Sequence, residues 1–210
     1  MDNDKITVRA LLEELKESIE TVYDPEGRCI REELKLEELA RFKSAAGAVT
    51  SILAVCQSCA LADELEKRGK IDTGAANGIK SSIENPNKNG FDIKYKGDSV
   101  GILAELKSTI PCGKDSRYGA KQRESISSDV ENLSGRSNKH KKCGIELSDY
   151  PQKYMVLFDV EGQRGAMKAL DKDMCKGGIE AIYIPTDLKV LSYADEGWVE
   201  EAGSPRGKNK

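Results

Sequence analysis

The sequence predicts an α/β fold, with a mixed central β-sheet flanked by helices and an additional helical region at the N-terminus. Three observations support this fold class. Apolar residues recur at helical spacing through the first third of the chain. Residues 91–107 then alternate between apolar and polar side chains, as expected of two strands. Helical and strand-like segments alternate over residues 119–184, which is typical of helices layered on a sheet.

The N-terminal 70 residues are predicted to be helical. Residues 8–22 carry apolar side chains at helical spacing, and Pro25 follows them. A second helical pattern runs from about residue 31 to residue 68. Residues 45–62 within it are unusually apolar and small, which predicts burial against the sheet or in a dimer interface. We expect no membrane-spanning segment, because no run of about 18 apolar residues stands out.

A β-hairpin is predicted next. Residues 91–96 and 100–107 each alternate apolar with polar side chains, and residues 97–99 (Gly-Asp-Ser) favour a turn. If the hairpin turns between residues 98 and 99, the numbers of paired residues sum to 197, and Asp92 lies opposite Glu105. A shift by one residue would pair apolar with polar residues. The face that each side chain occupies is therefore fixed more firmly than its partner.

Asp92 and Glu105 would thus be two carboxylates on one face of the hairpin, with Lys107 two residues beyond Glu105 on the same face. Directly opposed residues have Cβ atoms roughly 4.5–5.5 Å apart, and like charges there are destabilising. A divalent cation would offset the repulsion, and Mg²⁺ accepts a few carboxylate oxygens while it retains several waters. In the alternative interpretation the face is solvated, and Lys94 and Lys107 neutralise the two acids. The spacing alone does not decide between these two interpretations.

The remaining elements complete the predicted sheet. Residues 154–160 are apolar almost without interruption, which is typical of a central strand buried on both faces. The polar, basic C-terminal residues are expected to be disordered. The other predicted elements are a short element near residues 79–83, helices at 119–133 and 163–174, and a strand at 179–184. The predicted organisation is a helical region (1–70), a core (71–195) and a tail (196–210).

Composition narrows the possible functions. His140 is the only histidine, which excludes catalysis that needs several histidines. The chain has no phosphate-binding loop at the required spacing, so we expect no nucleotide cofactor. Net charge is −3, but basic residues cluster between residues 114 and 142 and could follow a phosphate backbone. The six cysteines are expected to be reduced thiols in a cytoplasmic protein, because the chain has no secretory leader pattern.

Asp92, followed after twelve residues by Glu105-Leu106-Lys107, resembles the signature of the PD-(D/E)xK nuclease superfamily, which includes many type II restriction endonucleases. The order helix, hairpin, helix, strand also resembles the restriction-endonuclease-like core, over roughly residues 60–185. Phe91 stands where the motif has proline, and the N-terminal third is not part of the common core.

The resemblance implies a Mg²⁺-dependent endodeoxyribonuclease that acts on double-stranded DNA, with a homodimeric type II restriction enzyme as the leading case. Mn²⁺ or Ca²⁺ would be able to replace Mg²⁺ in binding. Asp92, Glu105 and the backbone carbonyl of Leu106 would bind the metal, and Lys107 would orient or help to deprotonate the attacking water. The residues that would contact DNA are Lys94, Lys114, Arg117, Lys121, Gln122 and Arg123.

Several alternatives stay open. Many relatives add an acidic residue from the preceding helix, and Glu64 and Glu66 are the candidates here. The chain could instead be a repair or structure-specific nuclease, or a non-catalytic DNA- or protein-binding module on a degenerate nuclease fold. An ordinary α/β interaction protein with a solvated, charged hairpin face is a further alternative.

Overall fold

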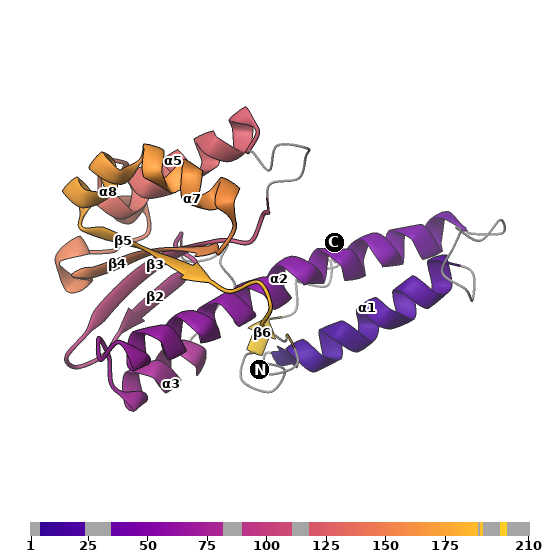
Figure 1. The fold of residues 1–210 in the computed structure, drawn as a ribbon. Coiled ribbons are helices and arrows are strands. Elements are labelled where there is room, and N and C mark those ends of the chain that lie inside the picture. Colours follow the sequence, from indigo (N-terminus) through magenta and orange to yellow (C-terminus); the bar gives the residue numbers. More distant parts are fainter. Residues whose placement is uncertain are drawn as a thin grey trace, which may run out of the picture.

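A computed structural model describes residues 5–23, 35–81, 90–110, 118–188, 190 and 198–200, which form an α/β core and a protruding helical arm (Figure 1). The core contains a four-stranded sheet in the order β2-β3-β4-β5. Strand β2 is antiparallel to β3, whereas β3, β4 and β5 are mutually parallel. The prediction of a mixed sheet flanked by helices is therefore confirmed. The strand bounds are Ile93–Lys96 (β2), Gly101–Lys107 (β3), Gln152–Phe158 (β4) and Ile179–Ile184 (β5).

The register of the β2–β3 hairpin is the predicted one. Ile93 pairs with Ala104, and Tyr95 pairs with Ile102. One part of the predicted alternation is wrong, because the residues before Ile93 form a bend and not a strand. Phe91 consequently packs in the same core as Leu103, whereas Ile93 packs in the other core.

Strand β3 is buried on both faces, and not on one face as the alternation suggested. Its first five residues, Gly101–Glu105, are all buried. The physical reason is its central place in the sheet, since β4 pairs along its other edge and helices cover both faces. The side chain of Glu105, which the alternation placed on the polar face, is therefore buried.

Helices cover the two faces of the sheet as separate layers (Figure 1). The second half of α2 and α3 lie on one face, where Ile102 and Ala104 contribute to the core. The helices α5, α7 and α8 lie on the other face, around Leu103 and Met155. The helix predicted at 163–174 is two helices separated at Leu170. The bounds are Leu36–Lys67 (α2), Thr73–Ser81 (α3), Ala120–Ser134 (α5), Lys139–Lys142 (α6), Glu161–Ala169 (α7) and Asp171–Gly177 (α8), with a 3-10 turn, η1, at Leu147–Asp149.

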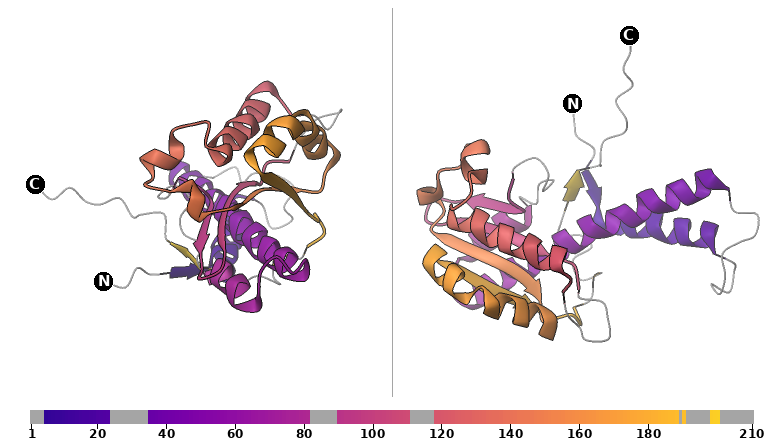
Figure 2. Two further views of the ribbon diagram at one scale, coloured as in Figure 1. Left: turned by 90° about the vertical axis from the view of Figure 1, so that its left-hand side faces the viewer. Right: turned by 90° about the horizontal axis from the view of Figure 1, so that it is seen from above.

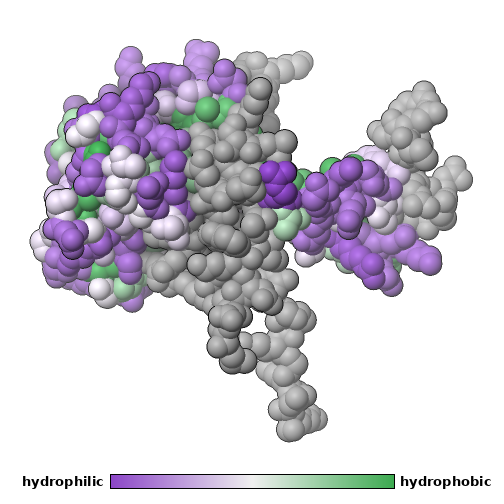
Figure 3. All heavy atoms as spheres, turned by 90° about the horizontal axis from the view of Figure 1, so that it is seen from below, coloured by the Kyte–Doolittle hydropathy of each residue, from purple (hydrophilic) through white to green (hydrophobic). Residues whose placement is uncertain are grey.

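The arm consists of α1 (Val8–Val22) packed along the first half of α2, and it protrudes from the core (Figures 1 and 2). The second half of α2 is buried against the sheet, which was one of the two predicted uses of residues 45–62. Ile19, Leu36 and Leu39 on the arm are exposed apolar residues. Elsewhere the surface is predominantly hydrophilic on the face shown in Figure 3.

Helix α2 is also long and apolar enough to cross a membrane by length and composition, and 53% of its most apolar stretch is buried within the molecule. The expectation that the chain has no membrane-spanning segment therefore stays a prediction. Small residues such as Ala45 and Ala60 supply much of its apolar character, and both are buried here. Burial of this kind is also typical of a core helix.

A small two-stranded sheet joins the two ends of the chain. Strand β1 (Lys5–Thr7) pairs antiparallel with β6 (Trp198–Glu200). Strand β6 lies within residues 196–210, where a tail without structure was predicted. The rest of that predicted tail falls outside the described residues.

Gly101 packs too tightly against the end of η1 to accept a side chain, since an added Cβ would lie 1.8 Å from the carbonyl oxygen of Asp149. We expect Gly101→Ala to lower the free energy of unfolding by about 1–3 kcal/mol or more, as overpacking does. Urea denaturation measures the effect. Gly165→Ala is the control, because nothing lies within 4 Å of its added Cβ. Unchanged stability of Gly101→Ala would contradict the close packing.

Candidate active site

The two predicted carboxylates lie together beneath α5. Glu105 projects from β3 on the same face as Leu103 and is only 4% exposed. Asp92 stands immediately before β2, and its Oδ2 accepts a hydrogen bond of 2.7 Å from the backbone N–H of Leu106. A side-chain hydrogen bond joins Asp92 to Glu105. The structure thus brings the two acids together, although Asp92 is not part of the β2–β3 ladder.

The electrostatics of this pair favour a bound proton. The pKa of Glu105 is raised to about 9, chiefly by burial and then by the neighbouring Asp92 and Asp129 carboxyls, whereas Lys139 opposes the increase. Burial also raises the pKa of Asp92, against the opposing effect of its hydrogen bond from Leu106. Both shifts in pKa favour a proton bound to the pair at neutral pH.

A lysine from α6 neutralises this site, and the sequence did not indicate it. Lys139 Nζ lies 2.7 Å from Glu105 Oε1 and 5.0 Å from the centroid of the Phe91 ring. Gly90 lets the segment that contains Lys139 and Cys143 pack closely here. Gly90 has a φ of +77°, which favours glycine. Its missing side chain also leaves room for Cys143 Sγ, which would lie 2.2 Å from an added Cβ. The sequence shows Lys139 only as one of the basic residues between 114 and 142. Its pairing with Glu105 was not predicted, because Glu105 is 34 residues away in the sequence.

Lys107 is held by α5 and not by the acidic pair. Its Nζ donates a hydrogen bond of 2.9 Å to Ser125 Oγ and forms an ion pair with Asp129. The Lys107 and Asp129 side chains are only 20% and 15% exposed. Sequence reasoning missed Asp129, although its position beside the buried Val130 places it at the edge of the apolar stripe of α5. This position beside a buried residue is the sequence feature from which Asp129 could have been identified.

The interpretation of a solvated face is wrong for Glu105, which is buried. The neutralising partners also differ from those proposed, because Glu105 pairs with Lys139 and Lys107 pairs with Asp129. Lys94 is exposed on the same face, since it lies opposite Leu103 in the hairpin. Only part of the charged face is therefore in contact with solvent.

The predicted DNA-binding residues are only partly described. Lys121 and Arg123 are exposed in the first turn of α5. Gln122 accepts a hydrogen bond of 3.0 Å from the backbone N–H of Gly119 and so caps α5. Lys114 and Arg117 fall outside the described residues.

The candidate acidic residues on the preceding helix have other partners. Glu64 forms an ion pair of 2.7 Å with Arg68, which also contacts Glu180 of β5. Glu66 accepts a hydrogen bond of 2.5 Å from Thr73. Neither has a described hydrogen bond or ion pair with Asp92 or Glu105, so the structure gives no support to a third carboxylate from α2.

Asp92 and Glu105 supply a donor set suited to a hard cation that keeps most of its waters. Mg²⁺ is commonly held by one or two carboxylates, and the backbone carbonyl of Leu106 belongs to the same strand segment. Among the described residues no group of three or more His, Cys, Asp or Glu side chains is arranged to hold a metal ion. A metal here would therefore rest on two carboxylates, and it would need the Glu105 proton to leave.

Comparisons with protein-family models, with curated proteins and with solved structures found no match to this chain. Functional inference therefore rests on the geometry and chemistry of the site.

Burial of Glu105 has a consequence for stability in the metal-free protein. The folded state keeps the Glu105 proton up to a pH of about 9, whereas the unfolded chain loses it near the ordinary value of 4.5. The folded state binds more protons between these values, so the free energy of unfolding should fall as the pH rises through this range. We expect Glu105→Gln to flatten this pH dependence and to unfold at higher temperature than the wild type at pH 8.

Thermal unfolding in EDTA between pH 5 and pH 9 measures this difference. The matched control is Glu146→Gln, which changes an exposed carboxyl and should retain the wild-type pH dependence. A Glu105→Gln curve parallel to that of the wild type would contradict the protonated state of the pair.

Proposed function

We propose that the protein is a Mg²⁺-dependent endodeoxyribonuclease with a restriction-endonuclease-like core, which hydrolyses phosphodiester bonds in double-stranded DNA. The observation that carries this proposal is the carboxyl pair of the buried Glu105 and the half-buried Asp92, with Lys107 at the end of the strand that carries Glu105. Buried acids with raised pKa values are costly to a fold and cluster at functional sites. The hairpin register agrees with the sequence motif that suggested this class.

In this proposal Asp92, Glu105 and the carbonyl of Leu106 would hold the metal ion. When bound, Mg²⁺ supplies polarisation of a phosphoryl oxygen and a water molecule of lowered pKa. Asp92 is fixed in place by the N–H of Leu106. Glu105 would have to lose its proton to serve as a ligand, and Lys139, 2.7 Å from its Oε1, would limit the charge that is then buried.

Lys107 would orient the attacking water and balance the charge that develops on the phosphoryl group. Ser125 and Asp129 fix the position of its ammonium group from α5. These two residues are positioning residues, since their described hydrogen bond and ion pair are made to Lys107; the Asp129 carboxyl also raises the pKa of Glu105 and Asp92. Position matters, because a misplacement of about 1 Å can reduce a rate by about 100-fold.

DNA would lie across the exposed part of this face. Lys94 on the edge strand β2, with Lys121, Gln122 and Arg123 at the start of α5, would contact the phosphate backbone. Lys114 and Arg117 belong to the same proposal. A palindromic site requires a two-fold dimer, and the exposed apolar residues of the α1–α2 arm are its proposed interface. A type II restriction enzyme in the cytoplasm is the leading case.

A second candidate is a non-catalytic DNA- or protein-binding module on a degenerate nuclease fold. One observation favours it: Lys139 Nζ lies 2.7 Å from Glu105 Oε1 and would compete with a cation for this carboxyl. This candidate predicts DNA binding that EDTA does not affect, and no cleavage. A repair or structure-specific nuclease would instead give nicks or smears where a restriction enzyme gives discrete fragments.

The proposal predicts that Asp92→Ala and Lys107→Ala each reduce Mg²⁺-dependent cleavage of supercoiled plasmid by at least about 100-fold, because each removes a group that acts on the reacting phosphate. EDTA should abolish cleavage by the wild type. Agarose gels of timed reactions measure the rates. Asp149→Asn, which removes an exposed ion pair with Lys96, is the control and should cleave at the wild-type rate. Wild-type rates for either active-site variant would contradict the assignment.

The positioning role of α5 is tested separately. We expect Asp129→Asn to reduce kcat by about 10-fold to 100-fold while KM for DNA stays unchanged, because Asp129 fixes Lys107 and touches no DNA in this proposal. Steady-state kinetics on a short duplex give both constants. Lys121→Ala is the comparison variant and should raise KM with little effect on kcat. An unchanged kcat for Asp129→Asn would exclude the role.

A further inference from the structure

Two buried glutamines converge on the backbone at the end of β3. Gln57 lies on the second half of α2 and is 1% exposed, and Gln163 lies on α7 and is fully buried. Because α2 and α7 cover opposite faces of the sheet (Figure 1), one amide approaches from each face. Glutamine is seldom buried, since its side chain then loses rotamer freedom and its polar atoms lose water. Two such residues at one point of the fold therefore indicate a specific role.

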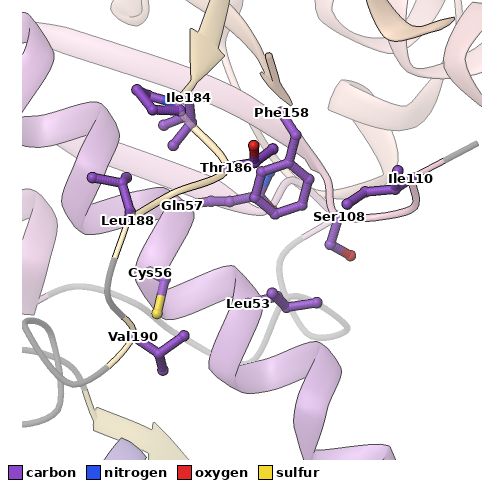
Figure 4. A pocket seen from close by; sticks show the side chains of 11 residues that line it. Leu53, Cys56, Gln57, Ser108, Ile110, Phe158, Ile184, Thr186, Leu188 and Val190 are labelled. Atoms are coloured by element: carbon purple, nitrogen blue, oxygen red, sulfur yellow. The ribbon is translucent and has the colours of Figure 1, made fainter. Parts of the chain in front are cut away.

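Gln57 holds the carbonyl group of Lys107. It stands in the wall of a pocket between α2 and the strand ends, and its side chain reaches toward Phe158 (Figure 4). Its Nε2 donates a hydrogen bond of 3.3 Å to the carbonyl oxygen of Lys107. Its Oε1 is buried without a partner among the described residues, which is costly. Within the described part of the chain, the Lys107 carbonyl is thus the only hydrogen-bond partner of this side chain.

Gln163 holds the backbone two residues further along. Its Nε2 donates a hydrogen bond of 2.9 Å to the carbonyl oxygen of Thr109 and lies 3.5 Å from that of Lys107. The hydroxyl of Tyr118, shortly before α5, donates to the same Thr109 carbonyl at 2.5 Å. Residues 107–109 are therefore anchored from α2, from α7 and from the segment that leads into α5.

This anchoring fixes one end of Lys107, and α5 fixes the other. Ser125 and Asp129 hold its ammonium group, while the glutamines hold its backbone. A lysine has a flexible stem, so the position of its ammonium group depends on both anchors. The carbonyl of Leu106, a proposed metal ligand, belongs to the adjoining peptide group. Movement of the backbone here would displace both groups, and a displacement of about 1 Å can reduce a rate by about 100-fold.

We infer that Gln57 and Gln163 are positioning residues, which clamp the backbone of residues 107–109 and so hold Lys107 in place to orient the attacking water. The catalytic consequence rests on the proposed nuclease function. The clamp itself rests on the two buried amides and their carbonyl partners. The described hydrogen bonds of both side chains are made to this backbone segment, so both residues act through it.

A double-mutant cycle tests the catalytic consequence. Gln57→Met removes the donor to the Lys107 backbone, and Ser125→Ala removes the hydroxyl at the other end of Lys107. Each should lower kcat for a short duplex by about 10-fold with KM unchanged. The double variant should lose only about 10-fold to 30-fold, because one misplacement of the ammonium group already removes most of its effect.

An unchanged kcat for Gln57→Met, or a double variant that loses the product of the two effects, about 100-fold, would overturn the inference. Ser58→Ala is the matched control. Ser58 is also buried on α2, and its Oγ has no hydrogen-bond partner among the described residues, so this variant should keep the wild-type kcat.

Backbone dynamics test the clamp without DNA or metal. NMR relaxation gives order parameters for the amides of residues 107–109 in the wild type and in the double variant Gln57→Met/Gln163→Met, or in Gln57→Met alone if the double variant does not fold. We expect values of about 0.85 in the wild type and a fall toward about 0.6 in the variant, while the amides of β5 keep theirs. Unchanged order parameters would overturn the clamp whether or not the wild type cleaves DNA. Lower order parameters together with an inactive wild type would support the clamp and refute the nuclease assignment.

Discussion

Burial of the Glu105 carboxyl in the middle of the fold is the constraint on which the rest of the site depends. A carboxyl at this depth needs partners or a proton, because an isolated buried charge is very costly. The chain provides Asp92 before β2, Lys139 on α6 and the proton that the raised pKa retains. Three separate segments thus meet at one side chain. The site exists only when the sheet, the hairpin and α6 are folded together.

Strand β3 connects the features that give the molecule its proposed chemistry. Its side chains toward α5 carry the charges, and its side chains toward α2 build an apolar core. At its end the Lys107 side chain is held by α5, while the Lys107 carbonyl accepts a hydrogen bond from Gln57 of α2. One residue therefore contacts the helix layers on both faces of the sheet.

Local sequence patterns predicted much of the fold. They did not predict the side-chain pairs between segments that lie far apart in the sequence. Alternation and turn residues predicted the hairpin register, because period and turn geometry are local properties. The same alternation misplaced Phe91, which follows a bend at Gly90. The partners Lys139 and Asp129 lie on helices far along the chain from β3, and only tertiary packing brings them to Glu105 and Lys107. Double-sided burial of β3 also depends on neighbours that pattern alone does not specify.

The central claim is that Asp92 and Glu105 together bind a divalent cation. Anomalous diffraction from crystals grown with Mn²⁺ at pH 8 tests it most directly. The account predicts a Mn²⁺ peak about 2.0–2.3 Å from oxygens of both Asp92 and Glu105, with Lys139 withdrawn from Glu105 Oε1. A structure in which Mn²⁺ is absent from this position, and in which the Lys139–Glu105 ion pair is intact, would contradict it.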